Sequence, residues 1–254
     1  MNLPVVNFQI HTPCDDRTIA DHIAHATSLG LPEADNAPLK TLTVVANGPS
    51  ARDAPLDGDT LALNGALSLY LNTNRTPTYW AACDPQAMVA DFLPKHPPRN
   101  ITYLIASKCH PDVFARLKGC DVRLWHIDDH PIPDQRRAVQ VASSVTLCIM
   151  PLMRRAFGYR AFEVYGWDAC YEQTAPGLIR HHASESPWDS YPTDVLDIVV
   201  GATQTKKGFK GGRTFKTSRT WAAEAQDAMI QLKYADYKVN IHGDGLIRAI
   251  KEMR

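Results

Sequence analysis

The sequence predicts an α/β fold, with a mostly parallel sheet covered by helices on both faces and a small N-terminal appendage. From about residue 40 onward, short apolar runs rich in β-forming residues alternate with helical patterns, and such alternation is typical of parallel sheets. Several of these runs end in small or polar residues, as strands do at the ligand-binding edge of such a sheet. We therefore expect a helical appendage over residues 1–39 and one main domain over residues 40–254, a length that allows one large core.

The expected elements follow one another in a regular order. The appendage carries one helical pattern, at residues 16–29, followed by a proline-rich polar stretch. Strands are expected at residues 40–46, 60–63, 79–82, 101–106, 122–126, 161–165 and 237–241. Helices are expected at residues 67–72, 88–93, 111–117, 143–156, 218–232 and 246–252.

Composition and charge exclude several classes of protein. The 27 basic and 27 acidic side chains give a formal net charge of +0, which offers no electrostatic basis for coating DNA or for polybasic membrane binding. No apolar run approaches the roughly 20 residues that span a bilayer, and the first residues lack a signal-peptide pattern. The six cysteines are scattered without a Cys-x-x-Cys pair. We expect reduced cysteines in a cytoplasmic protein that does not enter a membrane.

The stretch Asn47-Gly48-Pro49-Ser50, directly after the apolar run at 42–45, is the most informative motif. Gly48 would let a ligand approach the backbone, and Ser50 could cap the element that follows. Taken alone, the four residues are better explained by an ordinary tight turn, and the other strand ends change that balance. Further strand ends carry Asn64-Gly65, Cys83-Asp84, the segment 166–171, and Gly243-Asp244-Gly245. If the strands are parallel, all these ends lie on one edge of the sheet, where ligands bind.

Individual side chains at these ends suggest specific contacts. Asn64 and Asp84 would recognise ribose hydroxyls or base edges, or else stabilise their own turns. Ser143 and Ser144 open a helical pattern, where free N–H groups would hold a phosphate or the hydroxyls would act as plain caps. The basic, glycine-rich run at 206–213 would form a lid over a phosphate or an acidic acceptor, or it would be a solvated loop. It lacks the Gly-Lys-Ser/Thr ending of a Walker A motif, which argues against P-loop chemistry.

The candidates for catalysis lie between residues 165 and 182. Asp168 and Tyr171 follow a predicted strand, and His181 and His182 lie on a loop beyond them. A histidine there would act as general base toward an acceptor hydroxyl, because its ordinary pKa suits proton transfer near neutrality. The histidine pair could also be half of a metal site, although no spacing in the sequence requires one.

Taken in order, these motifs resemble a known family. Val-Ala-Asn-Gly-Pro-Ser (45–50), Ala-Leu-Asn-Gly (62–65), Ala-Cys-Asp-Pro (82–85), Ser-Ser (143–144), Tyr-Gly-Trp-Asp-Ala-Cys-Tyr (165–171), the His-His pair and His-Gly-Asp-Gly-Leu-Ile (242–247) are similar to the MptE-like 6-hydroxymethylpterin diphosphokinase family. Its wider superfamily includes motility-associated flagellin glycosyltransferases and bacterial sialyltransferases that use a CMP-sugar. The resemblance covers roughly residues 40 to 250, and it implies a Rossmann-like sheet with a nucleotide across the strand ends.

The resemblance also implies roles for individual residues. Residues 47–50 match the phosphate-side loop, Asn64 and Asp84 match nucleoside contacts, and Ser143 or Ser144 matches a nucleotide-contacting serine. Asp168 and Tyr171 match the stretch beside the donor, and His181 or His182 falls where such transferases carry their catalytic base. The nucleotide-binding set implied is Asn47, Gly48, Pro49, Ser50, Asn64, Gly65, Asp84, Ser143, Ser144, Gly166, Tyr171, Gly243, Asp244 and Gly245.

Three functions are therefore weighed. The first is a nucleotide-sugar glycosyltransferase that modifies an acceptor hydroxyl, with Asp168, His181 and His182 as catalytic residues and no required metal. The second is an ATP-dependent pyrophosphokinase acting on a hydroxymethyl group, with Mg²⁺ held by Asp84, Asp168 and Asp244. The third is a nucleotide-binding protein without catalysis. The acceptor is left open among a small molecule, a glycan, a protein and a modified nucleic-acid base, and a homo-oligomer is also considered.

Overall fold

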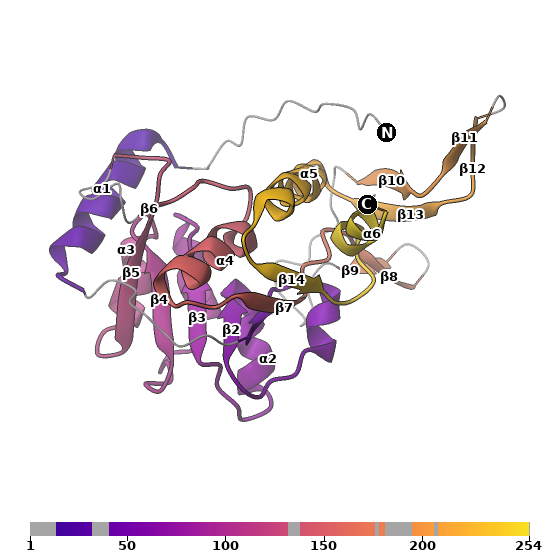
Figure 1. The fold of residues 1–254 in the computed structure, drawn as a ribbon. Coiled ribbons are helices and arrows are strands. Elements are labelled where there is room, and N and C mark those ends of the chain that lie inside the picture. The colour runs from indigo at the N-terminus through magenta and orange to yellow at the C-terminus, as the bar shows by residue number, and fades with distance from the viewer. Residues whose placement is uncertain are drawn as a thin grey trace.

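The computed structural model describes residues 14–31, 41–131, 138–175, 178–180, 195–205 and 208–253. It has the predicted α/β architecture: an eight-stranded sheet flanked by helices, with antiparallel two-stranded ribbons at one end (Figure 1). Every neighbouring pair of strands in the large sheet runs parallel. The predicted fold class is therefore confirmed.

Strand β1 (Thr41–Val45) lies near the middle of the sheet, whose order is β14-β7-β1-β2-β3-β4-β5-β6. On one side the chain adds β2 (Thr60–Leu63), β3 (Tyr79–Ala82), β4 (Thr102–Ala106), β5 (Asp121–Ile127) and β6 (Ala138–Val139). It then returns to the other side of β1 with β7 (Ala161–Tyr165) and β14 (Lys238–Ile241). All seven strands expected in this sheet are confirmed. The strands β2 to β5 are largely buried, as in parallel sheets, whereas β14 alternates between exposed and buried residues.

The reversal of direction next to β1 is the feature that creates a binding position. After β1 the chain adds β2 to β6 on one side of β1, whereas β7 lies next to β1 on the opposite side. The loops that follow β1 and β7 therefore leave the sheet toward opposite faces, and open α/β sheets bind ligands between such loops. Val45 pairs with Tyr165, so the two strands end at the same level.

The helices lie on both faces of the sheet, as predicted (Figure 1). Right-handed crossovers place the helices between β1 and β5 on one face and those between β6 and β14 on the other. The first group comprises η1 (Pro49–Asp53), η2 (Asn64–Ala66), α2 (Leu67–Leu71), η3 (Ala87–Phe92) and α3 (Pro111–Arg116). The second comprises α4 (Val145–Ala156) and α5 (Arg219–Tyr234), and α6 (Leu246–Glu252) follows β14 and packs on α5. The helix expected at 88–93 is a 3-10 helix, η3.

Helix α1 (Asp16–Ser28) confirms the helix expected near the N-terminus. Asp15 caps it by accepting a hydrogen bond from the Thr18 N–H at 2.7 Å. Its buried face packs on α3 and, through Ile19 and Ile23, on Ala138 of β6. The boundary between residues 39 and 40 falls outside the described residues and stays a prediction. Within the described part of the chain, no helix is long and apolar enough to cross a membrane.

The antiparallel ribbons between β7 and α5 were not predicted. They pair β8 (Glu172–Ala175) with β9 (Leu178–Arg180), β10 (Leu196–Val200) with β13 (Arg213–Thr217), and β11 (Thr203–Thr205) with β12 (Gly208–Lys210). The β11–β12 end projects away from the body of the molecule (Figure 1). The predicted lid at 206–213 coincides with β12 and the start of β13, while residues 206–207 lie outside the described residues.

Candidate functional site

The ends of β1, β7 and β14 meet in one junction. The Gly48 N–H donates to the carbonyl oxygen of Gly166 at 2.8 Å, and the Gly166 N–H donates to Ser50 Oγ at 2.8 Å. The Ser50 N–H in turn donates to Asp168 Oδ2 at 2.8 Å. From the β14 side, the Leu246 N–H donates to the carbonyl oxygen of Asp168 at 2.8 Å. The predicted motifs at 47–50, 166–171 and 243–245 are thus brought together.

Glycine at this junction is required by packing. A Cβ at Gly166 would overlap with the carbonyl oxygen of Ala46, and one at Gly243 would overlap with the Ser50 side chain. At Gly245 it would overlap with the backbone of Asp168. The φ angles of Gly166 and Gly243 are +71° and +87°, which also favours glycine. Tight packing therefore accounts for these glycines without a ligand, and their predicted nucleotide contacts stay predictions.

Asp168 holds the junction together from its centre. Its side chain is buried, with 4% of the residue exposed. Burial raises the pKa of this carboxyl, and hydrogen bonds from the backbone and side chain of Ser50 act in the opposite direction. Through the Ser50 N–H it also caps the first turn of η1.

A small cavity, which we name the switch-point crevice, opens between the ends of β1 and β7 and the start of α4. Its volume is about 180 Å³. Asn47 and Asn64 line it, and the side-chain Oδ1 atoms of both are buried without a hydrogen-bond partner. Buried amide oxygens are rarely left in this state, so the crevice offers two acceptors to a ligand. Gly65 lies against the Asn47 amide, since a Cβ there would be 3.1 Å from Asn47 Oδ1.

The N-terminus of α4 forms another wall of the switch-point crevice. Ser144 is the N-cap, and its Oγ accepts a hydrogen bond from the Leu147 N–H at 3.4 Å. Ser144, Val145 and Thr146 line the crevice, so the positive end of the helix dipole faces it. Ser143, by contrast, bonds to Asp227 Oδ2 through its N–H at 2.9 Å and its Oγ at 2.8 Å, and does not line the crevice.

Glu224 of α5 is a crevice residue that was not predicted from the sequence. It is 8% exposed, and its Oε1 accepts a hydrogen bond from Trp167 Nε1 at 2.6 Å. Burial raises the pKa of Glu224, while hydrogen bonds from Ser144 and Trp167 oppose the shift. One signal was present in the sequence: Glu224 lies beside Ala225 and four residues before Ala228, on the buried face of the helix.

A larger cavity of about 650 Å³, which we name the β13 cavity, lies on the other side of Asp168. It is enclosed by η1, the loop after β7, strand β13 and the start of α6, and Tyr171 and Asp244 line it as predicted site residues. Of its charged residues, Arg52, Glu172 and Arg248 were not predicted, whereas Arg213 ends the basic run that was predicted as a lid. Asp168 and Cys170 line both cavities.

The remaining predicted residues lie elsewhere. Asp84 accepts a hydrogen bond from the Gln86 N–H at 2.9 Å, as expected of a turn residue, and lines neither cavity. Asp244 pairs with Arg213 in the β13 cavity. Among the residues that the structure describes, no three His, Cys, Asp or Glu side chains form a metal-binding group, so Asp84, Asp168 and Asp244 do not converge. His181 and His182 lie outside the described residues.

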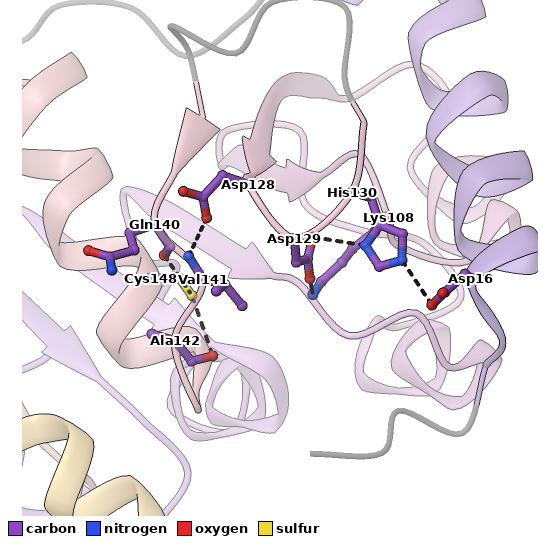
Figure 2. Close-up of polar contacts among 9 residues, drawn as sticks. All are labelled: Asp16, Lys108, Asp128, Asp129, His130, Gln140, Val141, Ala142 and Cys148. Atoms are coloured by element: carbon purple, nitrogen blue, oxygen red, sulfur yellow. Dashed lines mark hydrogen bonds and ion pairs between the residues drawn. The ribbon is translucent and has the colours of Figure 1, made fainter. Parts of the chain in front are cut away.

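The ends of β4 and β5 lie on the same edge of the sheet but are filled by charged side chains. Lys108, which follows β4, donates to Asp129 Oδ2 at 2.5 Å, and His130 contacts both Asp129 and Asp16 of α1. Figure 2 shows His130 between these two carboxylates, with Lys108 on Asp129. Nearby, Asp128 accepts a hydrogen bond from the Val141 N–H at 2.5 Å (Figure 2). This part of the edge is closed.

The chain has the fold of one solved glycosyltransferase. It is similar to the MAf glycosyltransferase from Magnetospirillum magneticum AMB-1, with a TM-score of 0.61 and 11% sequence identity. The match covers 93% of this chain and 38% of that chain, so this chain spans little more than a third of the larger protein. At this identity the similarity shows a shared fold. The sequence matches no protein-family model and no curated protein.

Proposed function

We propose that this chain is a transferase that binds a nucleotide donor in the switch-point crevice and passes a glycosyl group to an acceptor hydroxyl. The observation that carries the proposal is the crevice itself: Asn47 and Asn64, whose buried amide oxygens have no hydrogen-bond partner, line it together with the first residues of α4 at the topological switch point. This is the position at which open α/β sheets bind nucleotides.

The crevice offers complementary groups to the two ends of a nucleotide. The first N–H groups of α4 have no partner within the helix and would bind the donor phosphates, a contact that the helix dipole favours. The Asn47 and Asn64 amides would accept hydrogen bonds from ribose hydroxyls or base amino groups. Burial raises the pKa values of Asp168 and Glu224, so each is protonated more readily than an exposed carboxyl.

The fold favours glycosyl transfer over pyrophosphoryl transfer, because the protein with the similar fold is a glycosyltransferase by name. The sequence resemblance includes both chemistries, since its family is named for a diphosphokinase and its superfamily includes flagellin glycosyltransferases. In addition, the aspartates required by the Mg²⁺-dependent alternative do not gather in the described residues. The general base stays assigned to His181 or His182. Asp168 is then a positioning residue, because its Oδ2 is bonded to the Ser50 N–H.

The experiment that tests the donor is a thermal-shift panel of CMP, UMP, GMP, AMP and ATP, each with and without Mg²⁺. A ligand that binds the folded state raises the midpoint according to its concentration relative to its dissociation constant. We expect CMP or UMP to raise the midpoint without metal. A shift with ATP and Mg²⁺ alone would favour the pyrophosphokinase, and no shift with any nucleotide would contradict the proposed function.

The substitution Asn47→Asp tests the location of the donor. It places a carboxylate in the crevice beside the proposed phosphates, so we expect a loss of nucleotide affinity of about tenfold or more. Asn100→Asp is the control, because Asn100 is exposed and bonds Thr76 at the opposite edge of the sheet. Equal nucleotide affinity in both variants would remove the loop after β1 from the site.

A further inference from the structure

The β13 cavity is a formed site held by backbone hydrogen bonds. The Tyr171 N–H donates to the carbonyl oxygen of Lys216 at 2.8 Å, and Thr217 Oγ1 donates to the carbonyl oxygen of Ala169 at 2.7 Å. Both bonds fix β13 on the loop that follows β7. Phe215, in the same strand, is buried in the hydrophobic core. The wall that β13 contributes to the cavity is therefore held by two hydrogen bonds and a buried side chain.

The two cavities are adjacent and share two lining residues. Asp168 and Cys170 line both of them. A donor whose phosphates lie at α4 would thus have its transferred group near the boundary with the β13 cavity. A molecule in that cavity would present its hydroxyls to the same boundary, as a transfer reaction requires.

The charges on the walls of the β13 cavity balance one another. Both carboxylate oxygens of Glu172 accept hydrogen bonds from Arg52 Nη2, each at 2.6 Å. Arg213 donates from Nη1 to Asp244 Oδ1 and from Nη2 to the Asp244 carbonyl oxygen, and its guanidinium lies 4.6 Å from the centre of the Phe215 ring. A site for phosphate or a nucleotide would carry an excess of positive charge, whereas this lining has four basic side chains (Arg52, Arg213, Lys216 and Arg248) and four acidic ones (Asp53, Asp168, Glu172 and Asp244).

We propose that the β13 cavity binds the acceptor, and that the acceptor is an uncharged, polyhydroxylated molecule such as a saccharide unit of a glycan. The assignment rests on the proposed function. Each guanidinium carries more N–H donors than its carboxylate partner uses, and hydroxyls both donate and accept. Tyr171, whose ring is tilted against Trp221 with 4.7 Å between ring centres, adds a flat aromatic wall. A volume of about 650 Å³ accommodates a mono- or disaccharide.

In the reaction that follows, an acceptor hydroxyl oxygen forms a bond to the anomeric carbon of the donor. The bond from that carbon to the phosphate oxygen breaks, and the departing nucleotide keeps the electron pair. The hydroxyl proton passes to the general base. The neutral β13 cavity binds the acceptor, and the helix end at the switch-point crevice stabilises the charge on the leaving group.

The test is binding of defined saccharides by saturation-transfer NMR, with and without CMP. The neutral probes are galactose, N-acetylglucosamine and lactose, and the charged probes are glucose 6-phosphate and N-acetylneuraminic acid. We expect the chain to bind a neutral probe and Arg213→Gln to weaken that binding by about tenfold. Tyr171→Ala is a second variant that removes a different wall of the cavity.

Arg75→Gln is a matched control for Arg213→Gln. Arg75 pairs with Asp57 before β2, at the far edge of the sheet, and its side chain is 48% exposed compared with 50% for Arg213. Nucleotide-induced midpoint shifts are measured on the same samples. The acceptor proposal is overturned if no neutral probe binds, if the charged probes bind more tightly, or if Arg213→Gln and Tyr171→Ala bind like Arg75→Gln. Because nucleotide binding is measured separately, failure of the proposed function would be distinguished by the absence of any midpoint shift.

Discussion

The loops at the carboxyl edge of the sheet differ between the strands around β1 and the strands β4 and β5. At β1, β7 and β14 the loops carry glycines and short polar side chains, and two cavities open around them. At β4 and β5 the loops carry Lys108, Asp129 and His130, which pair with one another and close the edge (Figure 2). The same edge of one sheet is thus open at the topological switch point and closed away from it.

The two regions also differ in how they accommodate buried acids. Asp129 is balanced by the ammonium group of Lys108. Asp168 and Glu224 instead accept hydrogen bonds from the Ser50 N–H and from the indole of Trp167. In a buried ion pair each charge has an opposite charge beside it, whereas burial raises the pKa values of Asp168 and Glu224 against the effect of their neutral hydrogen-bond donors. The comparison predicts that substitutions in the two regions have different consequences.

The largest effect is expected from Gly166→Ala at the open end. The new Cβ would overlap with the Ala46 carbonyl oxygen at a φ of +71°. The left-handed conformation costs about 1–2 kcal/mol and the overlap about 1–3 kcal/mol, so we expect a loss of about 4 kcal/mol in the free energy of unfolding. Urea denaturation would measure it.

Gly58→Ala is the control for that substitution. Gly58 has a φ of +81° but no atom within 4 Å of the Cβ position. We expect a loss of about 1 kcal/mol there, from the backbone conformation alone. Similar losses in both variants would mean that the junction of the three strand ends is not tightly packed.

At the closed end, Lys108→Met is expected to have the next largest effect. It leaves the Asp129 carboxylate, 17% exposed, without its ammonium partner, at a cost of about 3 kcal/mol. The double variant with Asp129→Leu should recover most of that loss, because both charges are then absent. Neither variant should change the nucleotide-induced midpoint shift. A change in that shift would show that the two ends of the edge are coupled.

The open end could be predicted from the sequence to a large extent. Runs such as residues 42–45 are apolar because the strands of a parallel sheet are buried on both faces, and the polar residues that follow them mark the edge. Asn47, Asn64 and Ser144 were expected at one edge and line one crevice. Asp84 follows the same pattern but lines neither cavity, because a residue at a strand end can bond its own turn instead.

The rest of the site carried too weak a pattern to be predicted. Strand β13 carries charged and polar residues around Phe215 and lacks an apolar run, whereas the run Ile198-Val199-Val200 of β10 is a strand signal that the sequence analysis did not use. Arg52 is an ordinary surface residue until the fold places it across one cavity from Arg213. Strand β6 has two residues, which is too short for any periodicity. Such features depend on tertiary contacts between distant segments.

A smaller effect, one of pH, is expected from Glu224→Gln. Burial raises the pKa of Glu224 above its ordinary value of 4.5, so the folded state keeps a proton that the unfolded state loses. The contribution of this residue to stability therefore decreases as the pH rises through the raised pKa. Glutamine still accepts the Trp167 hydrogen bond and does not titrate. We therefore expect the free energy of unfolding of Glu224→Gln, measured by urea denaturation, to increase relative to that of the original chain between about pH 5 and about pH 8. A difference between the two chains that does not change with pH would contradict the raised pKa.

The smallest effect is expected where α1 packs against the closed end. His22 is buried, with its ring 5.1 Å from that of His110, and burial lowers its pKa below the ordinary value of 6.5. The unfolded state then binds more protons than the folded state, so the attachment of α1 should weaken as the pH falls below about 6.5. Hydrogen exchange of the amides of residues 16–28 would measure it. In His22→Gln the side chain at this position cannot be protonated, so lowering the pH should accelerate exchange less than in the original chain. If exchange accelerates equally in both proteins, the titrating group is not His22.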